Sequence, residues 1–129
     1  MTLKLIPALA LLTLLAMPTA NAVEASLTIT LGTDASADVE RRSQTYECTT
    51  GEPFSVVYLN ASPNFLALVP LPDETERLVF SSVIAASGVR YVSGKWAWWT
   101  KGPEASLYDL TLGEDAEPVN TCTEFNNAP

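Results

Sequence analysis

Residues 86–110 read ASGVRYVSGKWAWWTKGPEASLYDL, and this stretch decides the class of fold. It contains three short runs rich in Val, Tyr, Trp and Leu, which are separated by Ser93-Gly94 and by Lys101-Gly102-Pro103. Aromatic and β-branched residues favour strands, and Gly and Pro favour the turns between them. The stretch therefore predicts three consecutive strands joined by tight turns.

The same pattern continues on both sides of this stretch, with strands spaced about ten residues apart. The expected strands are Gln44–Thr49, Phe54–Asn60, Phe65–Val69, Arg77–Ser82, Gly88–Val92, Lys95–Thr100, Ala105–Leu110 and, less clearly marked, Val119–Thr123. Short strands at this spacing are typical of a small antiparallel sandwich or barrel. The chain is thus expected to be all-β, with seven to eight strands.

The first 22 residues have the order of a secretory signal peptide: Lys4, an apolar run over residues 5–17, then Ala20-Asn21-Ala22. The alternative, a membrane anchor, is disfavoured because a spanning helix needs about twenty apolar residues. No cysteine near residue 22 offers a thiol for a lipid anchor. We therefore expect a soluble periplasmic protein without a membrane anchor.

The remaining 107 residues are enough for one domain. Residues 23–43 are predicted to be a lead-in segment that contains one alternating, strand-like run at residues 26–31. Residues 44–129 are predicted to form the domain itself.

Charge is unevenly distributed along the chain. Seven bases and fifteen acids give a net charge of −8, which argues against nucleic-acid partners and favours a basic protein partner. Residues 77–103 are the exception, because they hold no acid and four bases: Arg77, Arg90, Lys95 and Lys101. Such a basic segment indicates either a binding surface or strand edges protected from aggregation.

Three tryptophans lie within one expected strand. Side chains alternate across a strand, so Trp96 and Trp98 share one face and Trp99 takes the other. One interpretation is that these rings belong to the core. The alternative is an aromatic platform for sugar rings, which would make the chain a periplasmic glycan-binding module.

Residue types argue against catalysis. The chain has no histidine, which excludes Ser-His-Asp and Cys-His arrangements, and two cysteines alone cannot build a zinc site. Ser87 and Lys101 could in principle pair as nucleophile and base, but no S-x-x-K motif frames the serine. We expect no enzyme activity, no cofactor and no metal.

The two cysteines, Cys48 and Cys122, flank most of the expected strands. A lone pair in an exported chain indicates a disulfide, with two free buried thiols as the alternative. In the chain-entropy model a disulfide that closes so long a loop contributes roughly 4 kcal/mol.

Two spaced blocks give the chain a specific resemblance. Residues 87–91, SGVRY, fit an SGxxY block, and residues 99–102, WTKG, fit a WxKG block. With Tyr46-Glu47-Cys48 and Cys122, they resemble the MliC/PliC family of bacterial inhibitors of c-type lysozyme, over residues 44–122.

The resemblance implies an eight-stranded antiparallel barrel closed by one disulfide. It also implies that Ser87 and Lys101 enter the lysozyme cleft and engage the two catalytic carboxylates. The residues of the two blocks beside them, Gly88, Arg90, Tyr91 and Gly102, are expected to complete the lysozyme-binding site. Pro103 departs from the family pattern and is expected to stiffen the turn that carries Lys101. Inhibition of another hydrolase is a third interpretation, and a homodimer stays open.

Overall fold

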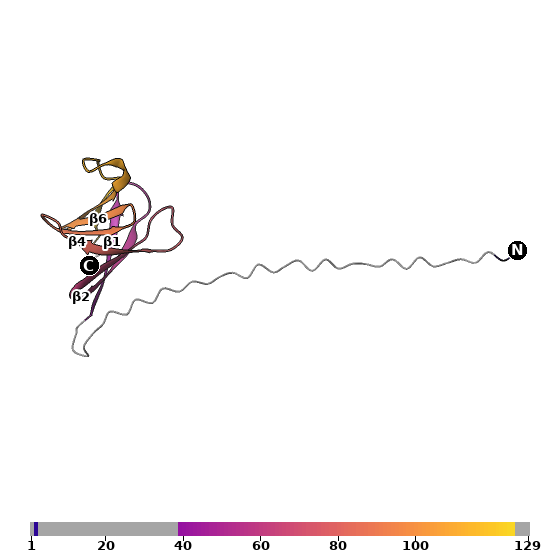
Figure 1. Cartoon of the computed structure of the whole chain (residues 1–129), viewed down its shortest axis with the longest axis horizontal. Coiled ribbons are helices and arrows are strands. Elements are labelled where there is room, and N and C mark those ends of the chain that lie inside the picture. Colours follow the sequence, from indigo (N-terminus) through magenta and orange to yellow (C-terminus); the bar gives the residue numbers. More distant parts are fainter. Residues whose placement is uncertain (1, 3–38, 126–129) are drawn as a thin grey trace.

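The computed structural model describes residue 2 and residues 39–125, and it is a closed antiparallel barrel (Figure 1). Each strand pairs with the next one in sequence, and the last pairs with the first. The strands are β1 (Glu40–Cys48), β2 (Phe54–Ala61), β3 (Asn64–Val69), β4 (Leu78–Val83), β5 (Val89–Ser93), β6 (Trp96–Lys101), β7 (Glu104–Asp109) and β8 (Asn120–Glu124). The expected all-β fold with about eight strands is confirmed, and a barrel rather than a sandwich is formed.

The core is built from inward-facing aromatic and aliphatic side chains. Trp98 is fully buried and meets Tyr46 edge-to-face, with ring centroids 5.2 Å apart. Burying one tryptophan removes roughly 150–250 Å² from water, which contributes about 4–6 kcal/mol as an upper estimate. Trp96 packs against the same core, whereas Trp99 points to the outside of β6 as strand alternation requires. The three tryptophans therefore do not form one platform.

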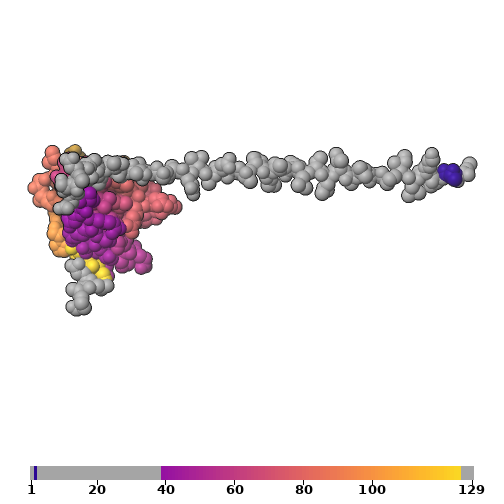
Figure 2. All heavy atoms as spheres, turned by 90° about the horizontal axis from the view of Figure 1, so that it is seen from below, coloured from indigo at the N-terminus to yellow at the C-terminus, as the bar shows by residue number. Residues whose placement is uncertain are grey.

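Strands β1 and β8 close the barrel. Their register pairs Tyr46 with Glu124 and Cys48 with Cys122, and the two cysteines form the expected disulfide with an S–S distance of 2.00 Å. The space-filling view shows the purple surface of the first strands beside the yellow atoms of the last described residues (Figure 2). The ends of the domain are thus held together by hydrogen bonds and by a covalent bond.

Two boundaries differ from the expectation. Residues 40–43 were expected in the lead-in segment, yet they begin β1 and pair with β2 from Asn60 to Val57. They are exposed and polar, so they lack the hydrophobic alternation that would mark a strand. A short 3-10 helix, η1 (Leu110–Leu112), follows β7, and Asp109 caps it by accepting a hydrogen bond from the Thr111 amide.

The signal peptide over residues 1–22 and the run at residues 26–31 lie outside the described residues. Within the described part of the chain, no helix is long and apolar enough to cross a membrane.

Candidate functional site

The pairing of β5 with β6 brings the two sequence blocks together. Val89 pairs with Thr100, so the Ser87-Gly88 loop lies against the end of β6 that carries Lys101. Gly88 has a φ of 64°. A Cβ atom there would stand 2.1 Å from the Thr100 carbonyl oxygen and 2.8 Å from Lys101 Cγ. Only glycine permits so close an approach, and the approach fixes the spacing of the two blocks.

Ser87 and Lys101 are both exposed at this end of the barrel. Gly102, with a φ of 56°, opens the turn between β6 and β7 that follows Lys101. Pro103 in this turn accepts a 2.7 Å hydrogen bond from the Glu124 amide, which ties the turn to β8. Stiffening of this turn by the proline ring stays a prediction.

Trp99, the first residue of the second block, contacts Ser87 of the first block and Lys101 of its own. Its indole Nε1 donates a 2.8 Å hydrogen bond to the Ser87 carbonyl, and the Lys101 ammonium lies 4.0 Å from its ring centroid. The Thr100 hydroxyl adds a 3.3 Å hydrogen bond to the Val89 carbonyl.

Arg90 and Tyr91 lie within strand β5, away from the loop that carries Ser87 and the strand end that carries Lys101. Arg90 is half-buried on the outer face, with its guanidinium carbon 5.8 Å from the Trp99 ring centroid and no hydrogen-bond partner for its buried Nε. Tyr91 points inward and is 6 % exposed, with its ring 5.6 Å from that of Tyr58. The structure therefore groups Ser87, Gly88, Lys101 and Gly102, and it separates Tyr91 from them.

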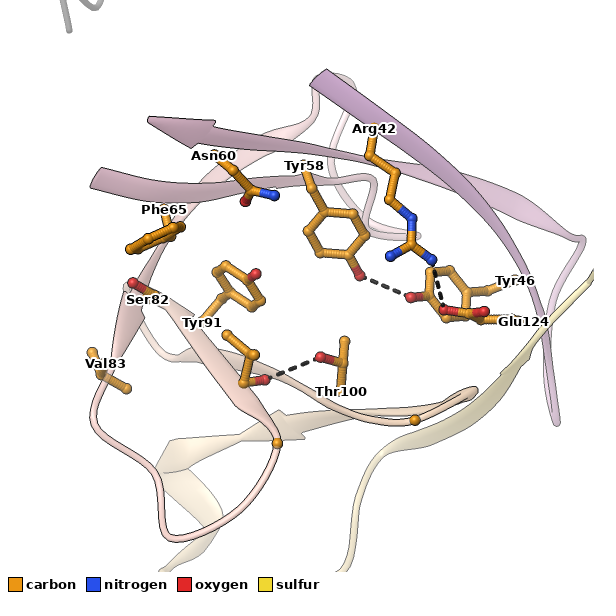
Figure 3. Close-up of a pocket in the computed structure, with 13 residues that line it drawn as sticks. Arg42, Tyr46, Tyr58, Asn60, Phe65, Ser82, Val83, Tyr91, Thr100 and Glu124 are labelled. Carbon is orange, nitrogen blue, oxygen red and sulfur yellow. Dashed lines mark hydrogen bonds and ion pairs between the residues drawn. The ribbon is translucent and has the colours of Figure 1, made fainter. Parts of the chain in front are cut away.

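A cavity of about 510 Å³ opens at the same end of the barrel (Figure 3). Gly88, Thr100 and Gly102 form part of its wall, next to the exposed block residues. Tyr58 and Tyr91 project into it, and Arg42 reaches toward Glu124 with an N–O distance of 3.4 Å. The other lining residues are Tyr46, Asn60, Phe65, Ser82, Val83 and Val89.

Hydroxyl groups at the floor of this cavity form a small network. The Tyr46 and Tyr58 hydroxyls are 2.9 Å apart, and Trp98 Nε1 donates to the Tyr58 oxygen at 2.9 Å. Burial, and then the hydrogen bond to Tyr58, raises the pKa of Tyr46 far above its usual range. Burial also raises the pKa of Tyr58 and of Tyr91. All three therefore stay neutral at physiological pH, and the Tyr46 and Tyr58 hydroxyls act as hydrogen-bonding groups rather than as acids.

Sequence reasoning missed the wall of the cavity, and Arg42 most clearly. Arg42 was expected in the lead-in segment, but it belongs to β1 and lines the cavity. The available signal was its position two and four residues before Gln44 and Tyr46, which places all three on one face of a strand.

Chemically, the exposed surface offers an ammonium at the end of β6 and a hydroxyl on the loop that lies against it. A lysine ammonium binds a carboxylate, and a serine hydroxyl both donates and accepts hydrogen bonds. Among the described residues, no group of three His, Cys, Asp or Glu side chains is placed to hold a metal ion. The arrangement suits recognition of an acidic group on a partner.

Comparison with known proteins identifies relatives of one kind. Residues 46–115 match the model of a family described as membrane-bound lysozyme-inhibitor of c-type lysozyme. A Pseudomonas aeruginosa protein named membrane-bound lysozyme inhibitor of C-type lysozyme is 48% identical over 89 residues, which cover 68% of each chain. A Cupriavidus necator protein of the same name is 38% identical over 78 residues, 60% of this chain and 61% of the relative.

One solved structure is also similar. It is the crystal structure of Pseudomonas aeruginosa MliC in complex with hen egg white lysozyme, with a TM-score of 0.61 and 40% sequence identity. The match covers 79% of this chain and 100% of that chain. The names of the relatives describe inhibitors, which are not enzymes.

These comparisons correct the expected localisation. The sequence led us to expect a soluble periplasmic protein without a lipid or membrane anchor. That expectation is wrong, since the matching family and both relatives are named membrane-bound, which points to a membrane-anchored protein. The reasoning depended on an apolar run too short to span a membrane and on the missing thiol near residue 22, and each of these bears on only one kind of anchor.

Proposed function

Because this chain belongs to the family of membrane-bound lysozyme inhibitors of c-type lysozyme, we propose that it inhibits such a lysozyme by placing Ser87 and Lys101 in the active-site cleft. The observation that carries this proposal is the packing of Gly88 against Thr100 and Lys101, which sets both exposed side chains at one end of the barrel. The Pseudomonas aeruginosa relative was crystallised with hen egg white lysozyme, and this makes that enzyme the first target to test.

The chemistry of the target fits these two groups. A retaining glycosidase of the lysozyme type holds two carboxyl groups about 5 Å apart, one protonated and one ionised. The Lys101 ammonium can pair with the ionised carboxylate. The Ser87 hydroxyl can donate to one carboxyl group and accept from the other.

Long-range charge supports the encounter. The chain carries a net charge of −8, so it attracts a basic enzyme from a distance. The basic segment of residues 77–103 contains both contact blocks, and it is the part that would meet the acidic cleft. We expect the association rate to fall as salt increases, because exposed charges are screened over about 10 Å at 0.1 M salt.

Export is part of the proposal. We propose that residues 1–22 act as a signal peptide, since they show the charged, apolar and small-residue order of such segments. The Cys48–Cys122 disulfide supports delivery to an oxidising compartment.

The glycan-binding alternative is not favoured by the placement of the aromatic rings. Trp98 is fully buried and cannot stack on a sugar. Trp96 is partly buried against the core, and Lys95 Nζ lies 4.5 Å from its ring. Trp99 faces outward but is covered in part by Arg90, Lys101 and Tyr108.

The test is inhibition of hen egg white lysozyme by the purified chain, measured on cell-wall substrate. We expect inhibition that weakens when a soluble N-acetylglucosamine oligomer occupies the cleft. Ser87→Ala should weaken binding by about 1–3 kcal/mol, because a hydrogen bond to a charged group is lost. Failure to inhibit any c-type lysozyme would overturn the function, and inhibition unaffected by the oligomer would overturn the cleft as the site.

A further inference from the structure

We infer that Trp99 is a positioning residue that holds both Ser87 and Lys101 in their contact geometry before the partner arrives, an inference that rests on the proposed function. The indole belongs to the second block, and it contacts Ser87 of the first block and Lys101 of its own block by different parts of the ring system. Its N–H holds the Ser87 carbonyl at 2.8 Å, and its π-face holds the Lys101 ammonium at 4.0 Å.

The Trp99 ring is itself contacted by side chains from both neighbouring strands. Trp99 lies on β6, the Arg90 guanidinium approaches it from β5 at 5.8 Å, and the Tyr108 ring approaches from β7 at 6.3 Å. It is half-buried between them. The indole is therefore a fixed platform rather than a freely rotating surface side chain.

The two groups that it contacts need such support. Ser87 lies in the loop between β4 and β5, outside any strand, and Lys101 has a long side chain with many rotamers. Ordering one such side chain at an interface weakens binding by roughly two- to tenfold. A ring that restricts both groups in the free protein removes part of that loss, so Trp99 should raise affinity without touching the catalytic carboxylates.

Two substitutions separate the two contacts. Trp99→Phe keeps an aromatic face for Lys101 but removes the N–H, and we expect it to weaken lysozyme inhibition roughly 3- to 10-fold. Trp99→Leu removes both contacts, and we expect roughly 10- to 50-fold. Trp96→Phe is the matched control. It lies in the same strand with Lys95 Nζ 4.5 Å from its ring, but at the opposite end from Ser87, and inhibition should stay unchanged.

A double-mutant cycle distinguishes positioning from general stability. If Trp99 positions Ser87, then Ser87→Ala should cost several-fold less in the Trp99→Leu background than in the wild-type chain, because contacting residues couple. A purely structural role lowers the melting temperature but leaves the effect of Ser87→Ala the same in both backgrounds.

A second readout needs no lysozyme. In the free protein the ε-methylene protons of Lys101 should show an upfield ring-current shift in NMR spectra, and Trp99→Leu should abolish it. If the wild type inhibits and both Trp99 variants inhibit equally well, this inference is overturned while the proposed function stands. If the wild type inhibits no c-type lysozyme, both fail together.

Discussion

The two ends of strand β6 carry the same local arrangement with different partners. At one end Lys95 follows Gly94 and lies over the Trp96 ring, and at the other end Lys101 precedes Gly102 and lies over the Trp99 ring. Lys95 also forms a 2.9 Å ion pair with Asp109. Within residues 39–125 no ion pair to Lys101 is found. Lys101 is therefore held over an aromatic ring without a carboxylate partner among these residues, and its ammonium can form an ion pair with a carboxylate of a binding partner.

The rest of the barrel follows the same division. In the barrel wall, the disulfide joins Cys48 to Cys122, which pairs with Ala105 of β7, and the Phe54 ring packs 6.0 Å from that of Trp98. The Lys101 end opens into the cavity whose lining includes the polar side chains of Arg42, Asn60 and Glu124. The wall therefore serves stability, and the Lys101 end leaves polar groups available for binding.

Exchanging each lysine for alanine is the strongest test of this division. Lys101→Ala should weaken lysozyme binding by about 2–5 kcal/mol, or roughly 30-fold to several-thousand-fold, because a buried contact with a carboxylate is lost. Lys95→Ala should change inhibition little, since exposed ion pairs contribute about 0–1 kcal/mol. The measurement is inhibition of hen egg white lysozyme, with thermal melts as the folding control. Equal losses for both variants would contradict the assignment of function to one end.

Removing the disulfide tests whether the stability of the barrel wall can be separated from binding. The Cys48→Ala/Cys122→Ala variant should lose roughly 2–5 kcal/mol of unfolding free energy, measured by denaturant titration. Inhibition at temperatures where the variant is still folded should persist, because strand β7 lies between Cys122 on β8 and the contact block on β6. Loss of inhibition in a folded variant would show that the disulfide and the contact blocks are coupled.

Substituting Gly88 and Gly94 by alanine compares how tightly the backbone is packed at the two ends of β6. Gly88 and Gly94 both have positive φ, so alanine at either costs about 1–2 kcal/mol of stability. Only at Gly88 does the new Cβ collide with the Thr100 carbonyl, whereas nothing lies within 4 Å of it at Gly94. Gly88→Ala should therefore show the lower melting temperature and should also lose inhibition. If Gly94→Ala lost inhibition to the same degree, the close approach of the loops would not be what matters.

The smallest expected effect concerns pH at the Lys95 end. Hydrogen bonds from the Thr111 hydroxyl and then from Lys95 lower the pKa of Asp109 from 3.8 to about 2. A lowered pKa in the folded chain stabilises it above pH 3.8, and this contribution disappears as pH falls to about 2. Asp109→Asn keeps a cap for η1 but removes the charge. Its melting temperature should lie below that of the wild type at neutral pH, and the gap should shrink across this window; a constant gap would argue against the ionised pair.

The sequence predicted most of the fold because the strands carry strong local signals. All eight expected strands are present, and the Trp96/Trp98 face is inward as alternation implies. The beginning of β1 was missed because residues 40–43 pair through their backbone while their side chains stay exposed and polar. Backbone pairing of this kind leaves no hydrophobic pattern to read.

The candidate site was predictable in part. The spacing of the two blocks placed Ser87 and Lys101 on neighbouring turns, and the structure brings these turns into contact. The direction of Tyr91 could not be foreseen, because its inward side depends on its register opposite Trp98. The link from Trp99 to Ser87 depends on the path of a loop, and loop paths are set by tertiary contacts rather than by local sequence.

The pairing of β8 with β1 determines when the barrel can close during synthesis and export. Tyr46 to Cys48 bond to residues 122–124, more than seventy positions later, so the barrel cannot close until its last strand is present. During synthesis or export from the N-terminus, β1 therefore keeps one unpaired edge until Asn120–Glu124 emerge. Contacts so distant in sequence slow folding, and open strand edges invite intermolecular pairing. A chain that stops before residue 120 should be prone to aggregate through the waiting edge of β1, however complete its contact blocks are.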